Sequence, residues 1–211
     1  MEMRADGDPT TLSEAEAAHI VRARPGRARE FAAGRQCARQ ALERLGRSGW
    51  DLLVRADRTP VWPLGIVGSI SHTTGCCGVA IGEQRHFRSI GLDIELDGRL
   101  TPDLHEQILT PSERSVLEKL PAGLVDKRAT LVFSAKEAFY KCQHPLTAEW
   151  MDFTDITVDL PDDLPEAGRL VVRPTRYLQI ERQVPPPWSG HFVCFEGFVA
   201  TGFAFREADG L

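Results

Sequence analysis

Apolar residues occupy every second position of Ile90–Leu96, which is the period of a β-strand with one buried face. Gly91, Asp93 and Glu95 then share the opposite face. Two carboxylates at this spacing lie roughly 6–7 Å apart, so one divalent cation is able to bridge them. A solvated acidic strand face is the alternative interpretation of the same pattern.

A second segment has the period of a helix. Between Leu131 and Cys142 the buried stripe is Leu131, Ala135, Ala138, Phe139 and Cys142. Glu137 and Lys141 lie one turn apart on another stripe. An exposed ion pair worth about 0.3–0.5 kcal/mol is the simplest interpretation of those two residues. Together with the acidic strand, they suggest instead a third carboxylate and a lysine at one cation.

The remaining pattern predicts short helices and hairpins in both parts of the chain. In the first part we expect a helix that begins at the capping box of Ser13 and ends near Arg24, before Pro25-Gly26. A second helix should cover about Arg27–Leu45 and stop at Gly46. Two strands, Ile66–Ser71 and Cys76–Ile81, should follow, joined by the turn His72–Gly75. In the second part we expect a helix from Thr110 to about Leu120 with Glu113 as its capping glutamate, a turn at His144-Pro145, strands Asp155–Leu160 and Leu170–Arg173, and a final hairpin of His191–Phe195 and Phe198–Phe205.

This order of helix followed by hairpin occurs twice. It predicts an α+β fold of two similar halves, residues 1–88 and 89–211, each with a small antiparallel sheet packed on helices. A cleft between such halves is a usual place for a ligand. The segment Gly98–Leu109 carries several leucines and is interpreted either as a docking surface for a partner helix or as core packing.

Composition and charge limit the classes of protein to which this chain can belong. The chain has 211 residues and a net charge of −5, so an extended nucleic-acid surface is not expected. No apolar run approaches the roughly 20 residues of a membrane span, and Met1–Pro9 does not resemble a secretory signal. Five cysteines without metal-finger spacing indicate reduced thiols in a cytoplasmic protein. Two halves in one chain favour a monomer.

Basic residues gather in one region of this acidic chain. They are Arg22, Arg24, Arg27, Arg29, Arg35 and Arg39. Guanidinium groups fit phosphate oxygens, so this helix is interpreted either as an anion site or as a solvated helix face. His72 lies where a strand gives way to a turn, and Ser71 and the arginines would make it a phosphate contact.

Five motifs occur in an order that resembles the 4′-phosphopantetheinyl transferases. They are Arg35-Gln-Cys-Ala-Arg39 with its following Ala-Leu and Leu-Gly pairs, Trp62-Pro63, Gly68-Ser-Ile-Ser-His72, Ile90-Gly-Leu-Asp-Ile-Glu95 and Phe133-Ser-Ala-Lys-Glu-Ala-Phe-Tyr-Lys141. The pattern is most similar to the actinobacterial and enterobactin-synthetase-component-D-like branch of the Sfp-type group. It covers about Glu30–Phe153.

The resemblance implies a reaction and a set of site residues. The phosphopantetheine arm of coenzyme A would move to a serine of an acyl or peptidyl carrier protein, releasing 3′,5′-ADP, with coenzyme A bound between the two halves. Matched positions imply Asp93, Glu95 and Glu137 as Mg²⁺ ligands, with Asp93, Glu137 and Lys141 as the catalytic residues. Lys141 would contact the diphosphate, and Glu137, or a water that it holds, would accept the serine proton. The implied contacts of coenzyme A also include Arg27, Arg35, Arg55, Arg58, Ser71, His72 and Lys136, and Glu113 would have a supporting acidic role.

Two other functions remain open on the sequence. A metal-dependent nuclease also uses acidic pairs with a Glu/Lys motif, but it should carry an extensive basic track. A non-catalytic module that binds coenzyme A or a carrier would keep the same scaffold. The carrier itself, whether for fatty acid, polyketide, siderophore or other peptide synthesis, is not indicated by the sequence.

Overall fold

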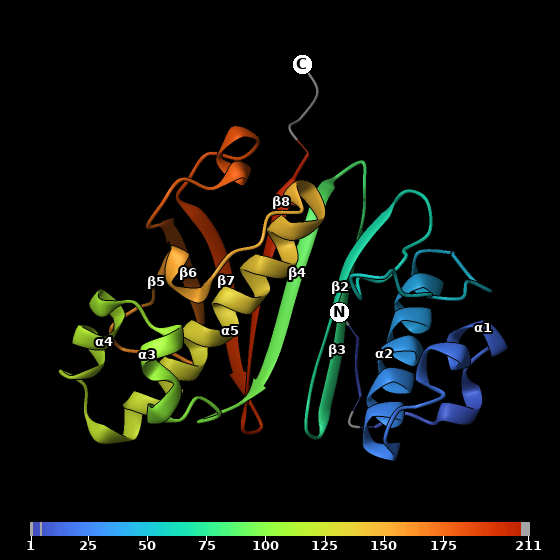
Figure 1. The fold of residues 1–211 in the computed structure, drawn as a ribbon, viewed down its shortest axis with the longest axis horizontal. Coiled ribbons are helices and arrows are strands. Elements are labelled where there is room, and N and C mark those ends of the chain that lie inside the picture. Colours follow the sequence, from blue (N-terminus) through green and yellow to red (C-terminus); the bar gives the residue numbers. More distant parts are fainter. Residues whose placement is uncertain (1, 5, 208–211) are drawn as a thin grey trace. The chain divides into compact units, whose positions relative to one another are not determined.

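The computed structural model describes residues 2–4 and 6–207 and shows a mixed α+β fold (Figure 1). Its contacts divide the chain into two units. Unit 1 runs to Ile90 and includes Arg206 and Glu207, and unit 2 comprises Gly91–Phe205. The expected boundary between residues 88 and 89 stays a prediction. Within the described residues, no helix combines the length and apolarity that crossing a membrane requires.

Unit 1 is a long helix packed on a three-stranded sheet. The antiparallel sheet has the order β1 (Glu2–Arg4), β3 (Cys76–Glu83) and β2 (Ile66–Thr73). The β2–β3 turn is tight because Thr73 pairs with Cys76 and Gly75 adopts φ +82°. Helix α2 (Pro25–Arg44) packs on this sheet through a core of Cys37, Ala38, Ala41, Leu52 and Val79. The predicted hairpin and long helix are therefore present.

The start of α2 corrects one prediction. Pro25-Gly26 does not end a helix from Ser13 but begins α2, with Pro25 in its first turn. Proline fits there because its missing N–H would have no partner in a helix and its φ is already helical. The preceding helix is shorter than expected, since α1 (Glu14–Ala17) passes into the 3₁₀ turn η2 (Ala18–Ile20) before Arg24. Gly46 does stop α2, with φ +71°.

Unit 2 is built on a five-stranded sheet and the longest helix of the described chain. The sheet order is β4 (Phe87–Leu96), β8 (Phe198–Arg206), β7 (Trp188–Phe195), β6 (Ala167–Pro174) and β5 (Ile156–Asp159). Helix α5 (Ala122–Thr147) packs on it through Phe139, whose ring lies 4.7 Å from Trp188, 5.5 Å from Phe203 and 6.2 Å from Phe205, between centroids. This helix carries the Glu137 and Lys141 side chains.

Short helices precede α5. They are η3 (Pro102–Leu104), α3 (His105–Ile108) and α4 (Pro111–Leu117). Of two further 3₁₀ turns, η4 (Phe153–Asp155) lies between α5 and β5, and η5 (Gln179–Arg182) lies between β6 and β7. The capping box of Thr110 and Glu113 is present at α4. In the segment Gly98–Leu109, Leu100, Ile108 and Leu109 are buried in the core of unit 2, whereas Leu104 is 36% exposed. Core packing therefore accounts for these three buried side chains, whereas most other residues of the segment are exposed.

The end of α5 corrects another prediction. The helix does not turn at His144-Pro145 but continues to Thr147, where Ala148 adopts φ +52° and its N–H donates to the His144 carbonyl at 2.8 Å. A left-handed residue of this kind closes a helix by satisfying a carbonyl of its last turn.

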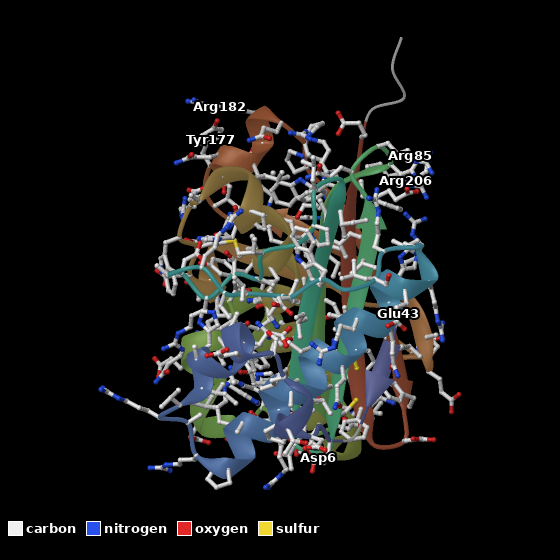
Figure 2. All side chains as sticks on the ribbon, turned by 90° about the vertical axis from the view of Figure 1, so that its right-hand side faces the viewer. Asp6, Glu43, Arg85, Tyr177, Arg182 and Arg206 are labelled. Carbon is white, nitrogen blue, oxygen red and sulfur yellow. The ribbon has the colours of Figure 1, made fainter. Side chains whose placement is uncertain are left out.

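Two contacts of arginine side chains at the surface join neighbouring segments of the chain. Arg182 at the end of η5 donates from Nε to the Tyr177 hydroxyl at 2.7 Å, and both side chains are labelled in Figure 2. The Arg206 guanidinium lies 5.9 Å from the ring centroid of Phe87. The end of β8 is thereby attached to the start of β4.

Candidate active site

Gly91 allows β4 to lie directly against α5. A Cβ at this position would fall 1.9 Å from the Ala138 carbonyl oxygen and 2.7 Å from the Cys142 nitrogen. Side chains alternate along a strand, so Asp93 and Glu95 lie on this same helix-facing side. The simple pattern of one buried and one solvated face is therefore wrong for β4, whose residues Ser89–Ile94 are all buried. The acidic face is covered by the helix that carries the third predicted carboxylate.

Asp93 and Lys141 form the closest ion pair of this region. The Lys141 ammonium lies 2.6 Å from Oδ1 of Asp93, and the two side chains are 28% and 3% exposed. An exposed Glu137–Lys141 pair is one of the two interpretations of the helix pattern, whereas the structure turns Lys141 toward the strand. A buried carboxylate requires such a compensating cation.

Glu137 lies within the electrostatic reach of the same two residues. Its pKa is raised from the usual value, first because burial disfavours the charged carboxylate and then because the negative Asp93 is near. The positive Lys141 opposes this increase. Glu137, Lys141 and Asp93 thus share one electrostatic site formed by α5 and β4.

Glu95 completes the acidic set at the end of β4. Its carboxylate is 14% exposed and lies 3.8 Å from Nε of Arg99. Over the part of the chain that the structure describes, no three His, Cys, Asp or Glu side chains are arranged as a ready metal-binding group. The cations beside the carboxylates are instead Lys141 and Arg99. The donor chemistry nevertheless fits Mg²⁺, because these are oxygen ligands and both competing cations are on long, rotatable side chains.

Unit 1 brings together basic residues that the sequence placed far apart. Arg27 at the start of α2 forms a hydrogen bond with Nε2 of His72 at the end of β2. Glu30 accepts from Arg27 at 3.2 Å and lies 3.6 Å from Nδ1 of His72. Ser71, the neighbour of His72, is buried. Arg27, His72 and Glu30 therefore form one cluster, in which Arg27 is exposed and His72 is half-buried.

The other predicted basic contacts differ in accessibility. Arg35 is buried, donates from Nε to the Leu52 carbonyl at 3.1 Å and stacks over the Phe31 ring at 3.7 Å from its centroid. Burial lowers its pKa to about 10. Arg55 and Arg58 are exposed in the turn after Leu52, where Arg58 adopts φ +68°. Arg35 supports the segment that carries these two arginines.

Lys136 and Glu113 occupy the interior rather than a binding surface. Lys136 is 0% exposed and donates from Nζ to Glu113 at 2.7 Å and to the Ile108 carbonyl at 2.8 Å. This placement does not support the predicted nucleotide contact of Lys136. The sequence assigned Glu113 a capping role and a supporting acidic role but missed this partner. One available signal was the burial stripe, because Val132 and Phe139 lie one turn to either side of Lys136.

Comparison with known proteins shows to which family the chain belongs. Residues 15–82 match the model of the 4′-phosphopantetheinyl transferase N-terminal domain, and residues 89–193 match that of the 4′-phosphopantetheinyl transferase superfamily. The 4′-phosphopantetheinyl transferase Svp of Streptomyces mobaraensis is 37% identical over 98% of this chain and 84% of its own length. The chain belongs to the 4′-phosphopantetheinyl transferase family.

Two further relatives belong to the groups that the motifs indicated. The 4′-phosphopantetheinyl transferase Npt of Nocardia iowensis is 32% identical over 85% of this chain and 82% of its own length. Enterobactin synthase component D of Salmonella typhi is 37% identical over 53% of this chain and 46% of its own length. The predicted family and reaction class are confirmed: this protein is an enzyme that transfers phosphopantetheine to carrier proteins.

Proposed function

We propose that this transferase moves the 4′-phosphopantetheine group of coenzyme A to a carrier serine at the Asp93–Glu137–Lys141 site, with Mg²⁺ and with release of 3′,5′-ADP. The observation that carries the proposal is the position of buried Asp93, which pairs with Lys141 at 2.6 Å on the strand face that α5 covers. Asp93, Glu95 and Glu137 would hold the ion. When bound, Mg²⁺ neutralises diphosphate charge, without which like charges at about 4 Å repel by about 4 kcal/mol at an effective dielectric of 20.

Lys141 is proposed to exchange partners during binding. In the structure its ammonium neutralises Asp93. With Asp93 engaged by a metal ion, the Lys141 ammonium would contact a diphosphate oxygen and would stabilise the charge that develops on the departing 3′,5′-ADP. Its partial exposure, 28% of the side chain, leaves room for this movement.

Glu137 is proposed to accept the serine proton, directly or through a water. Its pKa is raised by burial and by Asp93, and a carboxylate of higher pKa is a better base near neutral pH. Metal ligation would oppose this role, because a bound cation lowers basicity. The two proposed roles of Glu137 are therefore separable by experiment.

The nucleotide end of coenzyme A is proposed to bind the basic residues of unit 1. The exposed Arg27 supplies donors suited to the 3′-phosphate, and His72, which accepts from Arg27 at Nε2, would orient this guanidinium, with Ser71 beside them. Arg55 and Arg58 are exposed and would contact the nucleotide. Arg35, being buried, would act through its contact with the Leu52 segment.

The protein partner is proposed to be an acyl or peptidyl carrier domain, bound by the transferase as a monomer. Leu104 is the apolar side chain that the Gly98–Leu109 segment leaves 36% exposed. It would contact an apolar position of a carrier helix.

Intact mass spectrometry tests the proposed function. The protein is incubated with an apo-carrier, coenzyme A and Mg²⁺, and the carrier is weighed. The expected result is a gain of one phosphopantetheine group and the appearance of 3′,5′-ADP. Binding of coenzyme A with no mass change in several carriers would indicate the non-catalytic module instead. Cleavage of added nucleic acid would indicate a nuclease.

A further inference from the structure

A buried ion pair outside the proposed site joins α5 to α4. Lys136 immediately precedes Glu137 in the helix, and its ammonium bonds to Glu113 of α4 at 2.7 Å. It also donates to the carbonyl of Ile108, the last residue of α3, at 2.8 Å. Two adjacent residues of α5 thus face different neighbours.

Glu113 is the centre of this contact. Besides Lys136, its carboxylate accepts the backbone N–H of Thr110 at 2.7 Å and that of Val158 in β5 at 2.7 Å. The Glu113 carboxylate therefore caps α4, accepts a backbone N–H of β5 and neutralises the Lys136 ammonium of α5. Because α4 and β5 are each attached to Glu113, the position of Lys136 relative to both is fixed.

We infer that the Glu113–Lys136 pair is a positioning device for the transfer reaction: it sets the rotation of α5 so that Glu137 and Lys141 face Asp93. The inference rests on the proposed function of those three residues. Successive helix residues are about 100° apart, so a helix fixed at Lys136 presents Glu137 in one direction only. Lys141 follows one turn after Glu137 and shares that direction.

The same geometry opposes a direct contact between Lys136 and the substrate. A side chain with 0% exposure and two short hydrogen bonds to protein oxygens has no surface to offer a nucleotide. Burial lowers the pKa of Lys136, and Glu113 opposes that decrease. The positive charge of Lys136 is therefore paired with Glu113 in the protein interior.

Three variants of the full-length protein test the inference. Lys136→Met removes the cation, and Glu113→Gln with Lys136→Met removes both charges while keeping an acceptor for the cap. Arg128→Met is the matched control, because Arg128 is also a buried cation of α5 bonded to carbonyls, those of Pro161 and Leu160 at 3.0 Å. It lies about 13 Å along the helix from Glu137.

The measurements are the thermal unfolding midpoint, the affinity for Mn²⁺ by electron paramagnetic resonance with coenzyme A present, and the affinity for coenzyme A by calorimetry in EDTA. We expect Lys136→Met to lower the midpoint and weaken Mn²⁺ binding by about tenfold or more, as loss of supporting contacts does at metal sites. Its affinity for coenzyme A in EDTA should stay within about twofold. The double variant should regain part of this stability, because neutralising both members of a buried pair removes the unpaired charge, although the glutamine oxygen replaces only one of the two carboxylate acceptors. Its Mn²⁺ affinity should stay weak, because the bond that sets the rotation of α5 is absent from this variant too.

Three results would overturn the inference. Unchanged Mn²⁺ affinity in Lys136→Met, with only the loss of stability that Arg128→Met shows, would reduce the pair to a packing role. Weaker binding of coenzyme A in EDTA by both the single and the double variant would make Lys136 a substrate contact. A stable double variant that binds Mn²⁺ as tightly as the wild type would mean that the charge pair is not what positions α5.

Folding of the variants does not limit the test. Should Lys136→Met fail to fold, the double variant alone still separates a substrate contact from a positioning role through its affinity for coenzyme A. A wild-type protein that binds no Mn²⁺ would contradict the proposed function and the inference together. Wild-type binding with unchanged variants would contradict the inference alone.

Discussion

The ammonium of Lys141 forms an ion pair with the buried carboxylate of Asp93, at 2.6 Å, although Glu137 lies one turn away on the same helix as Lys141. A metal ion bound through Oδ1 of Asp93 would therefore displace Lys141. We therefore expect one substitution at Lys141 to change metal affinity and catalysis in opposite directions.

Lys141→Ala should bind Mn²⁺ more tightly than the wild type in the absence of coenzyme A, since no ammonium competes for Asp93. The same variant should lose about 100-fold or more in the rate of transfer, because a group that stabilises the developing charge is gone. Metal titration and a carrier-mass time course measure the two effects. Lys119→Ala, an exposed lysine of the same unit, is the control and should change neither. Weaker metal binding by Lys141→Ala would refute the competition.

Gly91→Ala should destabilise the protein strongly. Its new Cβ would lie 1.9 Å from the backbone oxygen of Ala138, and backbone atoms of a packed helix do not move aside easily. We expect a loss of about 3 kcal/mol or more in the free energy of unfolding, beyond typical overpacking of side chains. Gly123→Ala is the matched control, because a Cβ there meets nothing within 4 Å. Urea unfolding that shows equal stability for both variants would contradict the close approach of β4 and α5.

Arg27→Ala should raise the KM for coenzyme A by about tenfold or more through loss of a charge-assisted contact. Dephospho-coenzyme A lacks the 3′-phosphate, so its KM should be the same for the variant and the wild type. Steady-state kinetics with both substrates measure the difference. An equal increase in KM for the two substrates would show that Arg27 does not bind the 3′-phosphate.

Glu137 should make stability fall as pH rises. Its pKa in the folded protein is raised above the ordinary value, so between these two values the folded state keeps a proton that the unfolded chain has lost. Folding is therefore favoured below this window and loses that contribution above it. Without metal, Glu137→Gln should be more stable than the wild type near neutral pH and lose this advantage toward about pH 4. Urea unfolding in EDTA across that range measures it, and a constant difference would contradict the raised pKa.

Much of this fold follows from local pattern. The alternation of Ile90–Leu96 predicts a strand, and the stripe that includes Phe139 predicts the face of α5 that packs on the sheet. Element ends were less predictable where two rules compete. Pro25 ends a helix by one rule and begins one by another, and in this chain packing of α2 on the sheet favours the beginning.

The candidate site was likewise predictable where local spacing decides and not predictable where tertiary contacts decide. Spacing placed Asp93 and Glu95 on one face and Glu137 and Lys141 on one helix stripe, because both follow from the local period. Spacing did not indicate that Lys136 is buried against Glu113, since that pair joins residues distant in the sequence. It also did not indicate that Arg35 is buried, because a basic helix stripe usually faces solvent. Tertiary partners decide those cases.

The central claim is that Asp93, with Glu137 and Lys141, performs a Mg²⁺-dependent transfer. Its most direct test is a single-turnover reaction between coenzyme A and an apo-carrier, followed by intact mass, with the wild type and Asp93→Asn across a range of Mg²⁺ concentrations. Wild-type protein should modify the carrier with Mg²⁺ and not in EDTA. Folded Asp93→Asn should leave the carrier unmodified at every concentration. Wild-type transfer in EDTA, or transfer by Asp93→Asn at the wild-type rate, would contradict the account.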